Sequence, residues 1–380
     1  MKLRFSKLTP ILLVAASVIA VFALMEIGIR VYEVIVGSSE EYEWEAASRW
    51  RGIHRMSEHE TLLYELVPDA EATIDYGSMG TVNYTISSAG LRNREVAVPK
   101  PEGAIRILVI GDSVTFGYYV PEESTFVARA ERNLVDRGIL VDVLNGGVGG
   151  YNTYNQVEWL KTYGLSLEPD LVVLAFCPND VDNPYYHFAW HTMDRLGDLP
   201  DAMIPDPAMR TREPDSSENV WGILGKRSKF LSLFIKRIGI LRVSFAAKKA
   251  RQSPDSDSYA EVLPYGECLR ELCNPGSPRV QWLRLQFGAI DSVASVNDFD
   301  WMILALPLSY QWSDGPGRCA QKTVSTLASE YGVPCLDPLN TPPDRYGELF
   351  FDPTHLTPRG HRWIGDVLSE SLLKWSAKTR

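Results

Sequence analysis

The chain has few cysteines and no excess of positive charge, and both absences narrow the classes of protein to which it can belong. Its 380 residues include five cysteines, with no Cys-x-x-Cys pair and no Cys/His cluster of the kind that holds zinc. Lysine and arginine number 38 against 48 acidic residues, a formal net charge of −10. Because nucleic-acid binding needs a basic face, this balance argues against nucleic acid as the main partner. The sequence also has no internal repeat and no long low-complexity tract.

The main apolar run of the chain lies at its N-terminus. It extends from Leu8 to Met25 and is followed by acidic residues at Glu40, Glu41, Glu43 and Glu45. Lys2, Arg4 and Lys7 precede it. About 20 apolar residues span a bilayer, so the run predicts a membrane anchor over 8–29. The charge asymmetry predicts a single pass, with residues 1–7 in the cytoplasm and the remaining chain outside.

The same run also fits a secretory signal peptide, with Val21-Phe22-Ala23 as the cleavage site. In that case the mature protein is secreted instead of anchored. Both interpretations place the folded domain outside the cytoplasm, in the periplasm or at the cell surface.

An exported protein folds where disulfides form. Cys177 ends an apolar run and is expected to be a buried thiol, whereas Cys268 and Cys273 can close a small loop. Cys319 and Cys335 pair with each other, pair elsewhere or stay free. The sequence leaves these alternatives open.

The pattern of the chain changes after the anchor. Residues 30–60 are polar and typical of a stalk, and 61–104 predict short strands or an extended lead-in that packs on the following domain. Over 105–376 apolar strands are expected at 105–110, 140–144, 171–176, 301–306 and 333–336. Helices are expected at 124–137, 153–164, 280–296, 317–331 and 358–375. This alternation predicts an α/β domain whose parallel sheet is covered on both faces.

Residues 185–279 interrupt the alternation and are expected to be an insertion. Within it, 225–252 carries nine lysines or arginines and no acidic residue, and its apolar residues recur every three to four positions. The spacing predicts an amphipathic helix. Such a helix either lies on anionic lipid or packs as a cap on the domain with its charges solvated.

Two separate segments carry residues that suit nucleophilic catalysis. Ser113 directly follows the strand predicted at 105–110, and Asp352 and His355 stand just before the last helix, for which Thr357 is the expected N-cap. A serine hydroxyl is a weak nucleophile until a base takes its proton, and the base works best when a third group fixes its tautomer. The three side chains supply these parts and favour acyl-transfer chemistry.

Two further segments offer donors for a developing oxyanion. Asn145-Gly146-Gly147-Val148-Gly149-Gly150 follows the second predicted strand, and Asn179 follows the third. Glycines let backbone N–H groups approach a ligand, and a side-chain amide can donate as well. Glycine-rich and Asn-Asp turns of purely structural role are the alternative.

These four segments, in this order, resemble those of the SGNH hydrolases, the GDSL-type esterase and lipase superfamily. The resemblance covers about residues 105–375. It implies a flavodoxin-like three-layer α/β/α sandwich with a central parallel sheet of about five strands. It further implies that Ser113 is the nucleophile, that His355 is the base and that Asp352 orients it. The implied oxyanion hole combines the Ser113 N–H, the Gly150 N–H and the Asn179 side chain.

Two positions depart from the family pattern. Pro178 precedes Asn179 where the family usually has glycine, which bears on the position of that amide. Val114 replaces a leucine after the serine, a change expected to affect only packing. Tyr310 and Trp312 follow the fourth predicted strand and line the substrate pocket or, alternatively, pack in the core.

The sequence therefore predicts an ester hydrolase of the cell envelope that acts on O-acyl, and in particular O-acetyl, esters of carbohydrate or lipid. It predicts no metal and no cofactor. The alternatives are an O-acyltransferase that uses the same residues and a catalytically silent binding module on the same fold.

Overall fold

The fold was examined in a computed structural model. The structure describes residues 13–14, 16–17, 20–28, 52–59, 61–182, 201–205, 265–311 and 318–379. The chain divides into two compact units, one made of 1–46 with 212–246 and the other of 47–211 with 247–380. In the first unit, 20–28 is helical. Within the described ranges, no helix combines the length and the apolar character that a membrane crossing requires.

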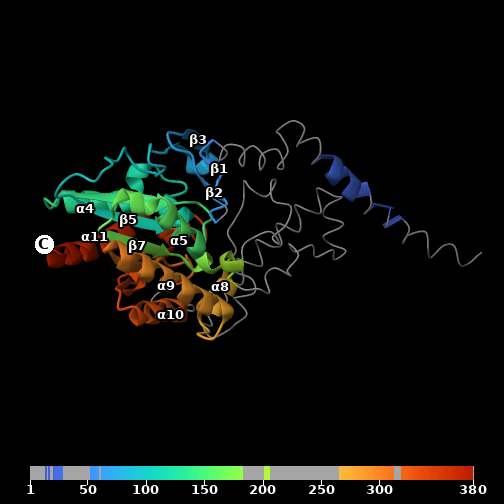
Figure 1. The fold of residues 1–380 in the computed structure, drawn as a ribbon. Coiled ribbons are helices and arrows are strands. Elements are labelled where there is room, and N and C mark those ends of the chain that lie inside the picture. The colour runs from blue at the N-terminus through green and yellow to red at the C-terminus, as the bar shows by residue number, and fades with distance from the viewer. Residues whose placement is uncertain are drawn as a thin grey trace, which may run out of the picture. The chain divides into compact units, whose positions relative to one another are not determined.

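The second unit is built on five parallel strands in the order β6-β5-β7-β8-β9 (Figure 1). Their bounds are β5 Ile105–Gly111, β6 Val141–Gly147, β7 Leu171–Phe176, β8 Asp300–Ala305 and β9 Cys335–Leu336. All six residues of β7 are buried, because helices cover both faces of a parallel sheet. The strands lie where the apolar runs predicted them, so the α/β fold with a five-stranded parallel sheet is confirmed.

Five longer helices connect and cover these strands. They are α4 Phe126–Val135, α5 Thr153–Thr162, α9 Pro278–Asn297, α10 Arg318–Glu330 and α11 Pro358–Thr379. Right-handed crossovers in this strand order put α4 and α11 together on one face and α5, α9 and α10 on the other (Figure 1). The predicted N-cap of α11 is present, since the Thr357 hydroxyl accepts from the Gly360 N–H at 3.3 Å.

Two antiparallel hairpins precede the sheet, and the first begins before the lead-in expected at 61–104, within the expected stalk 30–60. One pairs β1 His54–Met56 with β2 Tyr64–Leu66, and the other pairs β3 Glu71–Asp75 with β4 Thr81–Thr85. The short helices are α3 Ser113–Phe116 and α8 Gly266–Leu272, with 3₁₀ turns η1 Gly77–Met79, η2 Glu122–Ser124, η3 Gly164–Leu167, η4 Pro178–Val181, η6 Asp201–Met203, η9 Pro338–Asn340 and η10 Tyr346–Leu349. The domain boundaries expected from the sequence, including insertion 185–279, stay predictions, and the basic segment 225–252 lies outside the described residues.

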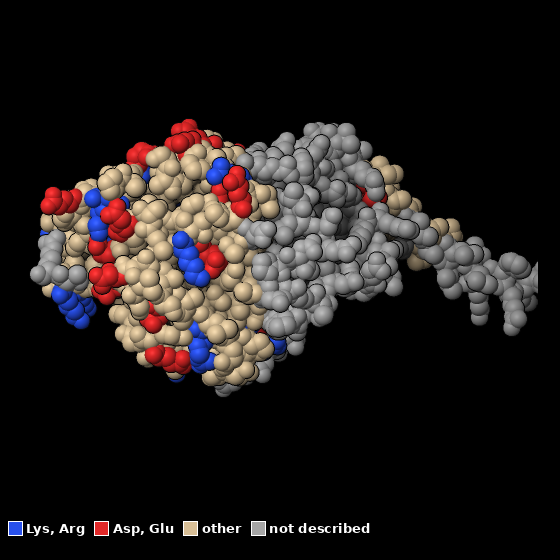
Figure 2. All heavy atoms as spheres, in the orientation of Figure 1, with Lys and Arg blue, Asp and Glu red and all other residues tan. Residues whose placement is uncertain are grey.

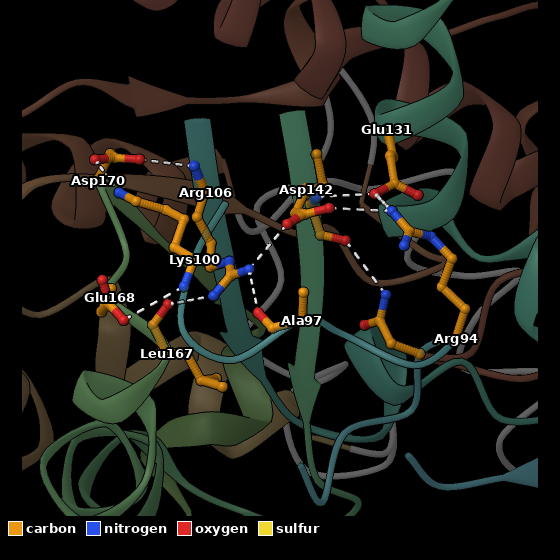
Figure 3. Close-up of polar contacts among 11 residues, drawn as sticks. Arg94, Ala97, Lys100, Arg106, Glu131, Asp142, Leu167, Glu168 and Asp170 are labelled. Atoms are coloured by element: carbon orange, nitrogen blue, oxygen red, sulfur yellow. Dashed lines mark hydrogen bonds and ion pairs between the residues drawn. The ribbon is translucent and has the colours of Figure 1, made fainter. Parts of the chain in front are cut away.

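A polar network fastens the lead-in to the amino ends of the strands, opposite the edge at which Ser113 stands (Figure 3). The Arg106 side chain is fully buried and donates to the Ala97 carbonyl at 2.7 Å and to Asp142 at 3.0 Å. Arg94 contacts the other Asp142 oxygen at 3.1 Å, and Lys100 pairs with Asp170 at 2.6 Å. A buried guanidinium needs such partners, so the register between lead-in and sheet is well defined.

On the face drawn in Figure 2, basic and acidic side chains are interspersed among uncharged ones over the described surface. Charges of both signs therefore share this face instead of gathering into one field.

The disulfide considered between Cys268 and Cys273 does not form, so that prediction was wrong. Cys273 pairs with Cys319 at a Cα–Cα distance of 4.9 Å, while Cys177, Cys268 and Cys335 are free thiols. Cys268 lies within α8 and Cys273 at its C-cap, and five helical positions point the two side chains to different sides of the helix. Cys319 opens α10, which packs against α8 and brings its thiol to Cys273.

A buried histidine at the junction of α4 and α11 predicts acid sensitivity. Burial lowers the pKa of His361 to about 3 from the ordinary 6.5, and its Nδ1 accepts from the Phe126 N–H at 3.2 Å. Between these pH values the unfolded chain binds a proton that the folded chain does not. The free energy of unfolding should therefore fall on acidification below pH 6.5, by up to about 1.4 kcal/mol per pH unit for one proton. Urea unfolding from pH 7 to 4.5 should show a shallower fall in His361→Gln.

His59→Gln is the matched control, because His59 is exposed. The same slope in wild type and His361→Gln would contradict the assignment of this acid sensitivity to His361.

Candidate active site

Ser113 stands at the carboxyl edge of the sheet because β5 ends at Gly111 and α3 begins two residues later. Asp112 caps α3, with its Oδ1 accepting from the Val114 N–H at 2.9 Å. The neighbouring strand comes very close here, since a Cβ on Gly147 would lie 2.3 Å from the Phe116 nitrogen. Only glycine permits this approach of β6 to α3.

The structure brings the three residues predicted for catalysis together. The Ser113 Oγ lies 2.8 Å from the His355 Nε2, and the His355 Nδ1 lies 2.6 Å from the Asp352 Oδ2. The His355 side chain is 15% exposed and that of Asp352 is 32% exposed. The three groups thus form one hydrogen-bonded chain, in which Ser113 is buried and its two partners are partly exposed.

The loop before α11 holds Asp352 as a carboxylate. Its Oδ1 accepts from the backbone N–H of Thr354 at 2.9 Å and of His355 at 2.8 Å. Burial raises the pKa of Asp352, but the hydrogen bonds from the His355 ring and from the backbone outweigh it and lower the pKa to about 2. An ionised carboxylate only accepts, so the His355 Nδ1 donates to Asp352, and the opposite ring nitrogen Nε2 is the one that faces the Ser113 hydroxyl.

The glycine-rich segment after β6 is fixed from the lead-in. The Tyr64 hydroxyl donates to the Gly149 carbonyl at 2.8 Å, and the Tyr151 hydroxyl donates to the Tyr64 carbonyl. A Cβ on Gly149 would lie 2.1 Å from the Tyr118 hydroxyl, and Gly150 has φ +79°. The positive φ favours glycine at Gly150, a side chain at Gly149 would have to displace the Tyr118 ring, and Gly150 is the one that is partly exposed.

The Asn179 side chain is held by Asp112, the residue before Ser113. Its Nδ2 donates to the Asp112 Oδ2 at 2.8 Å, which leaves the second amide hydrogen available. Pro178 occupies the first position of η4, where its lacking N–H costs no hydrogen bond. The departure from the family pattern is therefore compatible with an ordered Asn179. Two roles of Asp112 were not predicted from the sequence, the cap of α3 and the hydrogen bond to Asn179. The cap had a signal in the sequence, because an acidic residue stands directly before the serine that opens the helix.

Arg92 is a further residue that the sequence analysis missed. Its side chain is 0% exposed and donates to the carbonyls of Phe116 at 2.6 Å, Gly117 at 2.5 Å and Val120 at 2.6 Å. The guanidinium also lies 4.2 Å above the Tyr84 ring. Burial lowers the pKa of Arg92 to about 10. Arg92 thereby closes the C-terminal end of α3, the turn that begins with Ser113.

Two tyrosines after α3 pack against the His355 ring. Tyr118 is stacked on it with centroids 5.4 Å apart, and Tyr119 meets it edge to face at 5.1 Å. Tyr310, expected to contact substrate, is buried beside Ser309, whose N–H donates to the Pro353 carbonyl at 2.8 Å. Its role stays a prediction, and Trp312 lies outside the described residues.

Within the ranges that the structure describes, no group of three histidine, cysteine, aspartate or glutamate side chains is arranged to hold a metal ion. The expectation of a site without metal or cofactor stays a prediction.

Comparison with known proteins shows which family the segment around Ser113 is similar to. Residues 109–206 match the model of the GDSL-like Lipase/Acylhydrolase family. An arylesterase of Vibrio mimicus is 33% identical over 75 residues, which are 20% of this chain and 38% of that protein. The chain thus spans 38% of the length of this relative. Residues 109–206 are thus similar to the GDSL-like Lipase/Acylhydrolase family, in line with the resemblance seen in the sequence.

Solved structures described as a lipase/acylhydrolase and as an esterase also align with this chain. The lipase/acylhydrolase of Enterococcus faecalis aligns over 70% of this chain and 95% of its own, with 15% identity and a TM-score of 0.37. The esterase EstA of a Pseudoalteromonas species aligns over 72% and 98%, with 11% identity and a TM-score of 0.39.

Removal of the Arg92 side chain should destabilise the α3 turn. Arg92→Met removes the side-chain donor of three buried carbonyls, and a buried carbonyl that loses its partner costs on the order of 1–3 kcal/mol. We expect a large loss in the free energy of unfolding, measured in urea. Arg94→Met is the matched control, because Arg94 is 57% exposed and its surface pairs are worth about 1 kcal/mol or less. Equal losses in both variants would show that Arg92 does not hold the turn.

Proposed function

We propose that the protein is a serine ester hydrolase that works through an acyl-enzyme. One observation carries the proposal: Ser113, His355 and Asp352 form a continuous hydrogen-bonded chain although Ser113 and His355 are 242 positions apart. Residues so distant in sequence have no structural need to meet in this order and geometry. The match of residues 109–206 to the GDSL-like Lipase/Acylhydrolase family and the similarity to an arylesterase support the same class of reaction.

The proposed mechanism follows from the hydrogen bonds that join Ser113 to His355 and His355 to Asp352. The His355 Nε2 takes the proton of Ser113 as its Oγ attacks the ester carbonyl carbon, and Asp352 stabilises the imidazolium. The imidazolium then gives its proton to the leaving alcohol while the bond between carbonyl carbon and alcohol oxygen breaks. Water activated by His355 releases the acid and restores Ser113.

The tetrahedral oxyanion is proposed to be held by three donors, namely the N–H groups of Ser113 and Gly150 and the side-chain amide of Asn179. Asn179 supports this role because Asp112 fixes one of its amide hydrogens and leaves the other to donate. Such preorganised donors lower the barrier because they do not reorganise during the reaction.

The substrate is proposed to be an O-acyl, and in particular an O-acetyl, ester of carbohydrate or lipid in the cell envelope. We further propose a domain outside the cytoplasm, tethered by 8–29 or released after cleavage. The basic residues before that apolar run support export. The disulfide between Cys273 and Cys319 suits an oxidising compartment.

Ser113→Ala should abolish the activity. We expect acetate release from acetyl esters to fall at least a thousandfold, since loss of a nucleophilic serine in a triad has effects of roughly that size or larger. The full chain is assayed with acetyl to long-chain esters, with and without a saccharide acceptor. Ser166→Ala, an exposed serine, is the control. Full activity in Ser113→Ala would refute the proposal of a hydrolase that uses Ser113. Serine-dependent transfer of the acyl group to the saccharide instead of to water would identify a transferase.

Asn179→Ala tests the oxyanion site separately. Removal of one such donor typically lowers kcat by about a hundredfold to a thousandfold with little change in KM. We expect that loss in kcat in Asn179→Ala, and we expect a phosphonate still to label Ser113 in this variant. Asn297→Ala, at the exposed end of α9, controls for loss of an asparagine. An unchanged kcat would remove Asn179 from the proposed oxyanion hole.

A further inference from the structure

Three aromatic side chains from distant segments meet beside the candidate triad and form what we term the aromatic rim: Tyr76, Tyr119 and Phe351. Tyr119 meets Tyr76 edge to face at 4.8 Å and Phe351 at 5.7 Å. Phe351 is 36% exposed, and the two tyrosines are half-buried. The rim touches the site through Tyr119, whose ring lies 5.1 Å from that of His355.

The backbone of Tyr119 is held in an unfavourable conformation. Its φ is +71°, in the left-handed region that a tyrosine rarely adopts. The Tyr119 N–H donates to the hydroxyl of the buried Tyr84 at 3.1 Å, and that hydroxyl bonds the Tyr76 hydroxyl at 2.8 Å. Strain of this kind persists where the surroundings enforce it, and it concentrates at functional sites.

Phe351 is fixed to the same site from the other side. Its N–H donates to the His355 carbonyl at 2.8 Å, so the loop that carries the candidate base also sets the position of this exposed ring. The rim therefore keeps a constant position relative to His355.

The chemistry of the proposed reaction decides which part of a substrate meets the rim. The His355 Nε2 must reach the alcohol oxygen to protonate it, whereas the carbonyl oxygen turns toward Gly150 and Asn179. Tyr118 already covers one face of the imidazole, with an interplanar angle of 17°. Tyr119 lies against the same imidazole at an interplanar angle of 86°, so the group attached to the alcohol oxygen can contact it as it leaves past His355.

We propose that the aromatic rim binds the alcohol part of the substrate, and that this alcohol is a sugar ring. The inference rests on the proposed function and specifies its substrate class. In the reaction, the Ser113 Oγ bonds to the acyl carbon as the bond from that carbon to the sugar oxygen breaks. The serine proton passes through His355 to that oxygen.

The rim matches a sugar in both its apolar and its polar parts. Aromatic rings offer flat apolar surface to the C–H faces of a pyranose. Asp352, whose side chain is 32% exposed, lies near the Tyr119 phenol, and burial together with the negative charge of Asp352 raises the pKa of Tyr119 to about 12. A polyhydroxyl ring can hydrogen-bond at this polar edge. Asp352 already accepts from the Thr354 N–H, the His355 N–H and the His355 ring, so an alkyl chain over its exposed part would only displace water from an ionised group, which is costly.

The test compares three acetyl esters in the full chain: an O-acetylated methyl glycoside, phenyl acetate and ethyl acetate. We expect wild type to favour the glycoside. Tyr119→Ala should lower kcat/KM for the glycoside about tenfold relative to ethyl acetate, mainly through KM, as fits the loss of one aromatic contact. Tyr119→Phe should keep the preference, and Tyr331→Ala, an aromatic near the opposite edge of the sheet, should leave all three rates unchanged.

Two results would overturn the inference. One is an equal loss for all three esters in Tyr119→Ala, which would show a structural role only. The other is a wild-type preference for phenyl or alkyl acetate over the glycoside. Neither affects the proposed hydrolase, which fails only if Ser113→Ala keeps the activity. Should Tyr119→Ala not fold, Phe351→Ala and Tyr119→Gly, which suits the positive φ, carry the same comparison.

Discussion

A single hydrogen bond, 2.8 Å between the Ser113 Oγ and the His355 Nε2, depends on the whole sheet. Ser113 is fixed by the end of β5, an inner strand next to one edge, and His355 by the loop that follows β9 at the other edge. The last helix returns over the sheet and packs against α4, which places that loop over the carboxyl end of β5. Any shift in strand register would move one partner by about 3.3 Å for each residue and break the contact.

The lead-in is part of the site and not only an approach to it. α3 is a single turn of four residues and has too few hydrogen bonds to be stable alone. Residues of 61–104 stabilise it and its surroundings. Arg92 donates to its C-terminal carbonyls, the Tyr84 hydroxyl accepts from the backbone N–H of Tyr119 after it, and the Tyr64 hydroxyl donates to the Gly149 carbonyl. Because these contacts come from a lead-in whose residues 94–100 are fastened to the opposite end of the sheet by the Arg106 network, the geometry at Ser113 depends on packing across the whole domain.

Local patterns of the sequence were enough to predict the elements and the triad, and insufficient for the contacts around them. Apolar runs, Thr357 and Pro358 mark where strands and α11 lie, and Ser113, Asp352 and His355 carry their chemistry in their identity. Arg92 resembles any charged residue of a turn, and nothing near it signals that it will be buried under α3. The Cys273–Cys319 pairing likewise follows from how α8 packs on α10 and not from the spacing of the cysteines.

The carboxyl groups of the site differ in charge because their surroundings differ. Asp352 is partly exposed and receives several hydrogen bonds, so its pKa is low and it can stabilise an imidazolium. Asp112 is fully buried, and burial raises its pKa; the pKa of the equally buried Asp180 is raised as well, by burial and by the charge of Asp112. Groups that hold their protons more tightly contribute less negative charge beneath Asn179. That matters for the proposed reaction, because a full pair of carboxylates there would oppose the oxyanion that Asn179 is proposed to stabilise.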